Sequence, residues 1–238
     1  MKLLIFMPSP RDVVEVKEAI DSINHDRLWV KYHPQLEAYH VGRMYFLEHM
    51  QYTHLMIIPD DLVVLPEHVE TLLSNCENYK VLSGWSNNTS LKTLQLGGNE
   101  LEADLLPEDA PDVDTTTSMT SLPPNPPSMG TYEGYHFDKI EHMEVLGKMP
   151  LLGKGTIHKI LHTGFAPTMM TREVIERIPF RGDETSGCCV DSCFSLDLHK
   201  EGIEQFVDAS VRTFHMNIHP RNIKVGRRPP VVIFHPQS

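Results

Sequence analysis

The clearest indication of the fold of this chain is a short apolar run that leads into two adjacent acids. Residues 55–58 are all apolar, and Pro59 then leads to Asp60 and Asp61. A run of this length that is stopped by a proline predicts a buried strand. Ligands of open α/β sheets bind beyond the carboxyl ends of the strands. Two adjacent carboxylates repel each other unless a cation or a ligand neutralises them. The pattern therefore predicts a metal-dependent site; in the alternative, the pair caps the helix expected at Pro66–Ser74 or lies in a solvated turn.

The composition is that of a globular protein and argues against a general nucleic-acid binder. The chain has 238 residues, of which 40% are hydrophobic and 22% charged, with a net charge of −11. A general nucleic-acid binder needs a basic face, which this charge does not favour.

No window approaches the ~18 apolar residues of a transmembrane helix. The apolar N-terminus is stopped by Pro8 and Pro10, so it predicts a first strand rather than a signal peptide. Four cysteines without a CxxC pair fit a reducing compartment, and we expect a cytoplasmic protein.

Strand patterns and helix patterns alternate along most of the chain. This order predicts an α/β fold with a mostly parallel sheet that helices cover on both faces. Ser9 is the expected cap of the first helix, with Pro10 at its first position. The expected strands are 2–7, 28–32, 54–58, 81–84, 163–170, 205–208 and 211–215, and the expected helices are 10–23, 36–50, 66–74, 171–178 and 190–200.

One domain, residues 1–220, accounts for this alternation. Residues 99–130 interrupt it with an acidic stretch rich in Pro, Thr and Ser that has neither helical nor strand periodicity. Such a stretch predicts a long surface insertion, which is either a lid or inert. Residues 221–238 form a basic C-terminal tail, whose arginines suit phosphate contacts.

Four motifs resemble those of the GT-A glycosyltransferases, in particular the family 2-like enzymes. Pro59-Asp60-Asp61 looks like their DxD-type motif, with proline in place of the first acid. Residues 164–180 are similar to a glycine–aromatic strand followed by a helix that ends in Ile-Pro-Phe. Residues 190–202 look like the second acidic motif, and 207–215 resemble a closing strand that ends on a histidine. The resemblance covers most of the chain outside residues 86–158 and implies a GT-A-like, Rossmann-like single domain.

The resemblance also implies an activity. It is the metal-dependent, inverting transfer of a sugar from a nucleotide-diphosphate sugar to a hydroxyl acceptor. Asp61 and His215 would bind Mn²⁺ or Mg²⁺ beside the leaving diphosphate. Asp191 would be the general base, because a helix N-terminus keeps its carboxylate ionised. The other expected contacts are Pro8, Ser9, Arg11, Asp60, Gly84 and Arg227 for the donor, and Trp85, Gly164 and Phe165 for the acceptor.

Two departures from the family pattern keep other functions open. Pro59 and Val190 stand where the family has acids. A catalytically inactive nucleotide- or sugar-binding module is therefore one alternative. A nucleotidyltransferase of similar architecture is the other, although residues 7–11 lack the glycines that usually follow the first strand of such enzymes.

Overall fold

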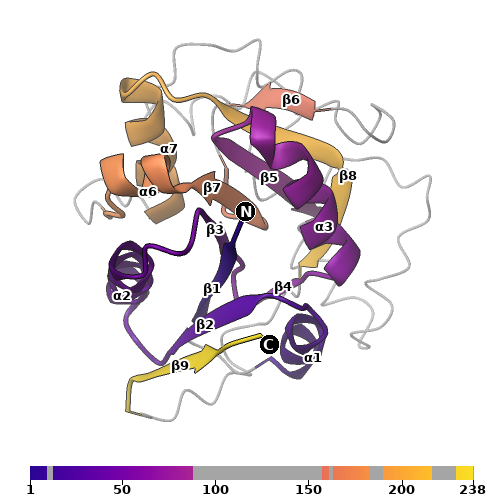
Figure 1. Ribbon diagram of the computed structural model, residues 1–238, viewed down its shortest axis with the longest axis vertical. Helices are drawn as coiled ribbons and strands as arrows, with labels where there is room; N and C mark the ends of the chain where they lie inside the picture. The colour runs from indigo at the N-terminus through magenta and orange to yellow at the C-terminus, as the bar shows by residue number, and fades with distance from the viewer. Residues whose placement is uncertain (10–12, 88–156, 161–162, 183–189, 216–228, 238) are drawn as a thin grey trace, which may run out of the picture.

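The computed structural model describes residues 1–9, 13–87, 157–160, 163–182, 190–215 and 229–237 (Figure 1). The insertion expected at 99–130 lies outside these residues, as do Arg11 and Arg227. Over the residues described, no helix is both long enough and apolar enough to cross a membrane.

The described residues form one α/β sheet with helices on both of its faces. The strands are β1 (Leu3–Ser9), β2 (Asp26–Lys31), β3 (His54–Ile57), β4 (Leu62–Val63), β5 (Val81–Asn87), β6 (Ile157–Ile160), β7 (Thr168–Thr171), β8 (Gln205–His215) and β9 (Val231–His235). The helices are α1 (Val14–Asp21), α2 (Gln35–Glu48), α3 (Pro66–Asn75), α6 (Arg172–Arg177) and α7 (Val190–Lys200), and a 3₁₀ turn, η1, spans Cys76–Asn78.

The sheet is mixed, whereas the sequence predicted a mostly parallel one. Its order is β4-β8-β5-β7-β3-β1-β2-β9, with β6 paired to β8. Among the described strands, β1, β2, β3, β5 and β8 run one way, and β4, β6, β7 and β9 run the other way. β7 lies between β3 and β5 and runs antiparallel to both of them. We call the end at which β1, β2, β3, β5 and β8 finish the carboxyl end of the sheet.

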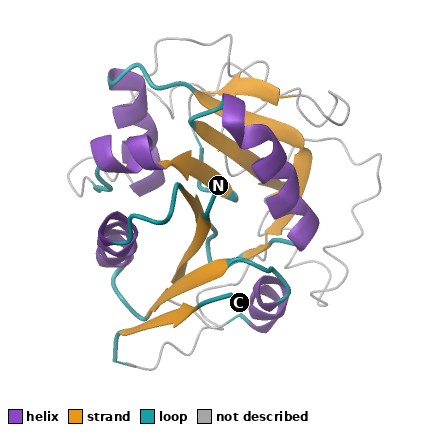
Figure 2. Cartoon of the chain, viewed as in Figure 1, coloured by secondary structure: helices purple, strands orange, loops and turns teal. Residues whose placement is uncertain are grey.

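Two apolar layers hold the helices against the sheet. Alternate residues of β1 enter opposite layers, because side chains of a strand alternate between its faces. Ile5 packs with Val16 of α1 and Val69 of α3, whereas Phe6 packs with Phe46 of α2 and with side chains of α6 and α7. Figures 1 and 2 show α1 and α3 on one side of the sheet and α2, α6 and α7 on the other.

The start of the first helix differs from its prediction. Ser9 is the last residue of β1, where it pairs with Lys31 of β2, and α1 begins at Val14 after Val13. The prediction that Ser9 caps this helix was therefore wrong, because the ladder with β2 extends β1 through Pro8 and Ser9. The end of α7 agrees with its prediction, since Gly202 follows it with φ +67° in the left-handed region.

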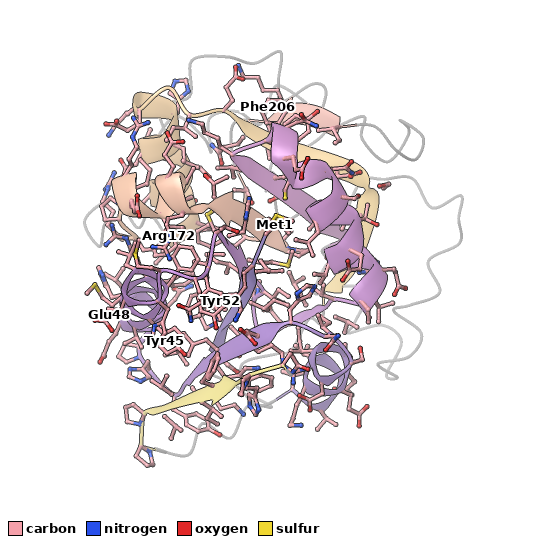
Figure 3. All side chains as sticks on the ribbon, in the orientation of Figure 1. Met1, Tyr45, Glu48, Tyr52, Arg172 and Phe206 are labelled. Atoms are coloured by element: carbon pink, nitrogen blue, oxygen red, sulfur yellow. The ribbon has the colours of Figure 1, made fainter. Side chains whose placement is uncertain are left out.

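Arg172 joins α6 to the end of α2 (Figure 3). Its Nε donates to the carbonyl of Tyr52 at 2.8 Å, and its Nη2 donates to the carbonyls of Phe46 and His49, both at 2.9 Å. The guanidinium also lies 4.4 Å from the centre of the Phe46 ring. The guanidinium of Arg172 thus donates to three carbonyls at the end of α2 and in the loop after it. Carbonyls at the C-terminal end of a helix have no partner within the helix, and Arg172 supplies one.

We expect Arg172→Met to lower the free energy of unfolding by about 2–3 kcal/mol, because it removes charged hydrogen bonds and leaves these carbonyls without their donor. Arg177→Met is the matched control on the same helix, since Arg177 makes half-exposed ion pairs with Glu173 and Glu201 and should matter little. Urea denaturation of the two variants measures the difference. Equal losses would contradict the capping role of Arg172.

Candidate active site at the carboxyl end of the sheet

The acid pair lies in a tight turn directly after β3. The amide of Ile58 donates to the carbonyl of Phe6 at 3.0 Å, which extends the pairing with β1 beyond the end of β3. The amide of Leu62 then donates to the carbonyl of Pro59 at 3.3 Å and closes a turn around the two acids. Asp60 is only 4% exposed, whereas Asp61 is half-buried. The two carboxylates are thus in different surroundings, which favours different roles for them.

A short antiparallel ladder brings this turn to the end of β8. Leu62 and Val63 of β4 pair with His215 and Phe214 of β8. The backbone of His215 is therefore next to that of Asp61, although the two residues are far apart in sequence. The sequence predicted these two residues as the metal ligands, and the structure brings their backbones together. The side chain of His215 lies outside the described part of the structure.

The ends of β1 and β2 lie at the same end of the sheet. Ser9 is buried and pairs with Lys31, and its carbonyl accepts the amide of Tyr32 at 3.1 Å. Tyr32 has φ +61°, which is costly for a residue with a side chain. Phe165, just before β7, has φ +55°. Such conformations concentrate at functional sites, and both of these residues stand at the carboxyl end of the sheet.

Gly84 is a glycine because its neighbours leave no room for a side chain. A Cβ there would lie 2.7 Å from Cγ1 of Val211 and 2.8 Å from the carbonyl oxygen of that residue. Its amide donates to the carbonyl of Pro167 at 3.0 Å. Packing alone accounts for this residue, and its contact with a donor stays a prediction. The next residue, Trp85, pairs with Arg212 of β8, but its side chain is not among those described.

Phe165 packs in the core. It is 1% exposed, and its ring centre lies 5.4 Å from that of Tyr39 and 5.5 Å from that of Phe194. The core therefore accounts for the aromatic ring. Contact of Gly164 and Phe165 with an acceptor stays a prediction.

Three buried hydroxyl groups fix the segment before β7. The Oγ of Ser83 lies 2.9 Å from Oγ1 of Thr163 and 2.6 Å from Oγ1 of Thr168, and the two threonine oxygens are 3.0 Å apart. Thr163 Oγ1 also accepts the amide of Phe165 at 3.2 Å. We call Ser83, Thr163 and Thr168 the hydroxyl cluster. It joins β5, β7 and the left-handed residue between them, and the sequence analysis missed it. A partial signal was available, since Ser83 follows two apolar residues in an expected strand and a buried hydroxyl group needs a partner.

The hydroxyl cluster also places the helix that carries Asp191. The amide of Thr163 donates to Oγ of Ser195 at 3.1 Å. Ser195 follows Asp191 by one turn on the same face of α7. The half-buried Asp191 is in the first turn of the helix, and its Oδ1 accepts the amide of Ser192 at 2.9 Å. α7 ends at Lys200, shortly before β8 begins at the end of the sheet opposite the carboxyl end. Its first turn therefore points toward the carboxyl end, which also carries the turn with Asp60 and Asp61.

Two carboxylates at this end, Asp60 and Asp61, could hold a divalent cation. Within the part of the chain that the structure describes, no three His, Cys, Asp or Glu side chains gather in the manner of a metal site. Mg²⁺ and Mn²⁺ in nucleotide sites use one or two carboxylates together with phosphate oxygens. At the carboxyl end, Asp61 and the neighbouring Asp60 would supply such carboxylate ligands.

Comparisons with known proteins show a likeness of fold. No protein-family model matches the chain, and no curated protein matches it. The crystal structure of A197 from STIV is similar, with a TM-score of 0.51 and 18% sequence identity over 90% of this chain and 85% of that one. At this identity the likeness concerns the fold alone.

The hydroxyl cluster should contribute measurably to stability. Thr163→Val keeps the shape of the side chain but leaves the amide of Phe165 and two buried hydroxyl groups short of a partner, so we expect a loss of about 1–3 kcal/mol in the free energy of unfolding. Thr71→Val is the control, because Thr71 Oγ1 donates a solvent-exposed hydrogen bond to the carbonyl of Glu67 in its own helix. Urea denaturation distinguishes the two variants, and a Thr163→Val variant as stable as the control would contradict the assignment.

Proposed function

We propose that the chain is a metal-dependent glycosyltransferase of the GT-A type. The observation that carries the proposal is the ladder between β4 and β8. It puts the turn with Asp60 and Asp61 against the end of β8, beside the ends of β1 and β2. Ligands of open α/β sheets bind beyond the carboxyl ends of the strands, where these acids lie. Strained residues such as Tyr32 also concentrate at functional sites.

In this proposal Asp61 holds the cation and the buried Asp60 binds the donor beside it. The bound Mn²⁺ or Mg²⁺ supplies charge to neutralise the leaving diphosphate. Asp60, being 4% exposed, is held in one position by the turn around it. The carboxylate of Asp60 is thus a fixed hydrogen-bond acceptor. A hydroxyl group of the ribose or of the sugar in the nucleotide-sugar donor suits it as a hydrogen-bond donor.

Asp191 accepts the proton of the acceptor hydroxyl. As the acceptor oxygen forms its bond to the anomeric carbon, the bond to the diphosphate breaks and the hydroxyl proton passes to the carboxylate. Ser195, one turn later, ties the helix to Thr163, so the carboxylate is held on a fixed element. In this proposal, the hydrogen bond between Ser195 and the amide of Thr163 helps to orient the base.

The missing acid before Asp191 has a physical explanation. Val190 is 3% exposed and packs in the apolar layer with Phe194 and Leu198. A carboxylate at position 190 would be buried among apolar side chains, where a charge is costly. A single carboxylate in this motif is therefore consistent with an enzyme.

The metal site can be tested without knowing the sugar. We expect one of UDP, GDP, CDP and dTDP to raise the melting temperature only when Mn²⁺ is present, because a ligand of the folded state stabilises it by mass action. Asp61→Asn should remove this Mn²⁺-dependent rise while the melting temperature without ligand changes little. Glu18→Gln, on the exposed side of α1, is the control and should keep it. A full Mn²⁺-dependent rise in Asp61→Asn would reject the assignment.

The base is tested with the nucleotide sugar whose nucleotide stabilises the protein. Asp191→Asn should lower turnover by about 10²–10⁴-fold with donor affinity nearly unchanged, because the amide cannot take the proton. Asp197→Asn on the same helix is the control. The Asp197 carboxylate binds Nε and Nη2 of Arg181 at 2.6 and 2.7 Å, so its loss should affect stability and leave turnover intact.

Two results of this assay would change the assignment. Normal turnover in Asp191→Asn places the base elsewhere or makes the mechanism retaining. A nucleotide that binds to the wild-type chain with Mn²⁺, without any turnover of its sugar, favours the inactive binding module.

A further inference from the structure

One long edge of the sheet, the outer side of β9, has no partner strand among the described residues. β9 pairs antiparallel with β2 over five consecutive residues, without a shift in register. The end of the strand is held in place, because the amide of Gln237 donates to Oδ1 of Asp26 at 2.8 Å. Asp26 is 6% exposed and also accepts the hydroxyl of Tyr52 at 2.8 Å. β9 is therefore a fixed strand with a row of backbone groups on its outer side.

Within β9 itself, no charged side chain opposes pairing with another strand. Native edge strands carry charges, bulges or inward-pointing lysines that prevent contact with another strand. Val231–His235 contains no Asp, Glu, Lys or Arg, and Val231, Val232 and Phe234 are 37%, 46% and 37% exposed. Phe234 and Tyr45 of α2 extend this apolar surface, with their ring centres 5.6 Å apart.

The prolines around β9 determine how a second strand can pair with it. Pro230 precedes the strand and Pro236 follows it, and proline has no amide hydrogen for a ladder. The pairing segment is thus limited to five residues, and Ile233 is its centre. An antiparallel pair of identical segments about Ile233 puts Val232 opposite Phe234 and Val231 opposite His235. These cross-strand pairs are a β-branched residue opposite an aromatic one, which stabilises antiparallel strands, and no like charges face each other.

We propose that β9 pairs with β9 of a second copy of this chain, antiparallel and with a two-fold axis through Ile233, so that two sheets become one. A second copy is the occupant that the five-residue segment fits, because the prolines that limit one strand limit the other equally. Such an interface is isologous, as expected for a two-fold dimer. The proposal does not depend on the proposed enzymatic activity.

Size and charge determine how strong this dimer is. A five-residue ladder with its flanking side chains is smaller than a standard interface of about 800 Å² per partner, so the dimer is weak and depends on concentration. Each copy carries a net charge of −11, so the copies repel each other and salt strengthens the association.

Sedimentation velocity over a range of protein concentrations, at low and high salt, tests the association. We expect the mass to rise from 27.1 kDa toward twice that value with concentration, and further at high salt. Val232→Lys should weaken the dimer by roughly tenfold or more, because an edge lysine opposes strand pairing. Val14→Lys is the control, since Val14 is 64% exposed on α1, and should leave the dimer unchanged.

Cross-linking tests the register. In the proposed dimer, the two copies of residue 233 face each other, whereas the two copies of residue 231 are about 13 Å apart along the strand. A short thiol cross-linker should join Ile233→Cys chains and leave Val231→Cys chains, like the wild type, unjoined.

A chain that stays monomeric under all conditions overturns the proposal, as does a foreign strand peptide that binds in place of the second copy. Equal cross-linking of the two cysteine variants, or a dimer unaffected by Val232→Lys, places the contact on another surface and likewise overturns it.

Discussion

The antiparallel strand β7, inserted between β3 and β5, holds the two halves of the sheet together. One side of β7 pairs with β3, and the other pairs with β5. It therefore joins the half of the sheet that contains β1 and β2 to the half that contains β5 and β8. The hydroxyl cluster stands at the start of this strand, and through Thr163 it also holds α7. The relative positions of the acid turn after β3 and of Asp191 on α7 thus follow from one antiparallel strand.

The two ends of the sheet use their buried acids differently. At the end opposite the carboxyl end, Asp26 has a structural role, with Lys2 Nζ 3.0 Å from its Oδ2 and with Tyr52 and Gln237 as hydrogen-bond donors. Burial raises the pKa of Asp26, but these hydrogen bonds outweigh burial and hold its pKa below the usual value. At the carboxyl end, two adjacent acids share one turn. In the proposed function, a cation and the donor are the partners of this pair.

The sequence predicted the helices and central strands well, because their apolar patterns are long. Val190, Phe194 and Leu198 are buried on α7 as expected, and β3 runs into the acid pair as expected. Strand direction was not predictable from periodicity, so β7 was not recognised as antiparallel. The strand expected at 163–170 forms only as Thr168–Thr171, because Phe165 takes a left-handed conformation ahead of it. β4 is too short for any pattern, and β9 lies in a stretch that its basic residues had marked as a tail. The hydroxyl cluster was missed because its three members are brought together only by the sheet.

The location of the bound metal is the central claim, and NMR with Mn²⁺ tests it most directly. Paramagnetic Mn²⁺, added with the nucleoside diphosphate that stabilises the protein, broadens the amide signals near its site. We expect broadening at the amides of Ser9, Asp61 and Leu62, at the carboxyl end. The amides of Lys2, Asp26 and Tyr52, at the opposite end of the sheet, should keep their line widths. Broadening at Lys2, Asp26 and Tyr52 with sharp signals at Asp61 and Leu62 would contradict the account.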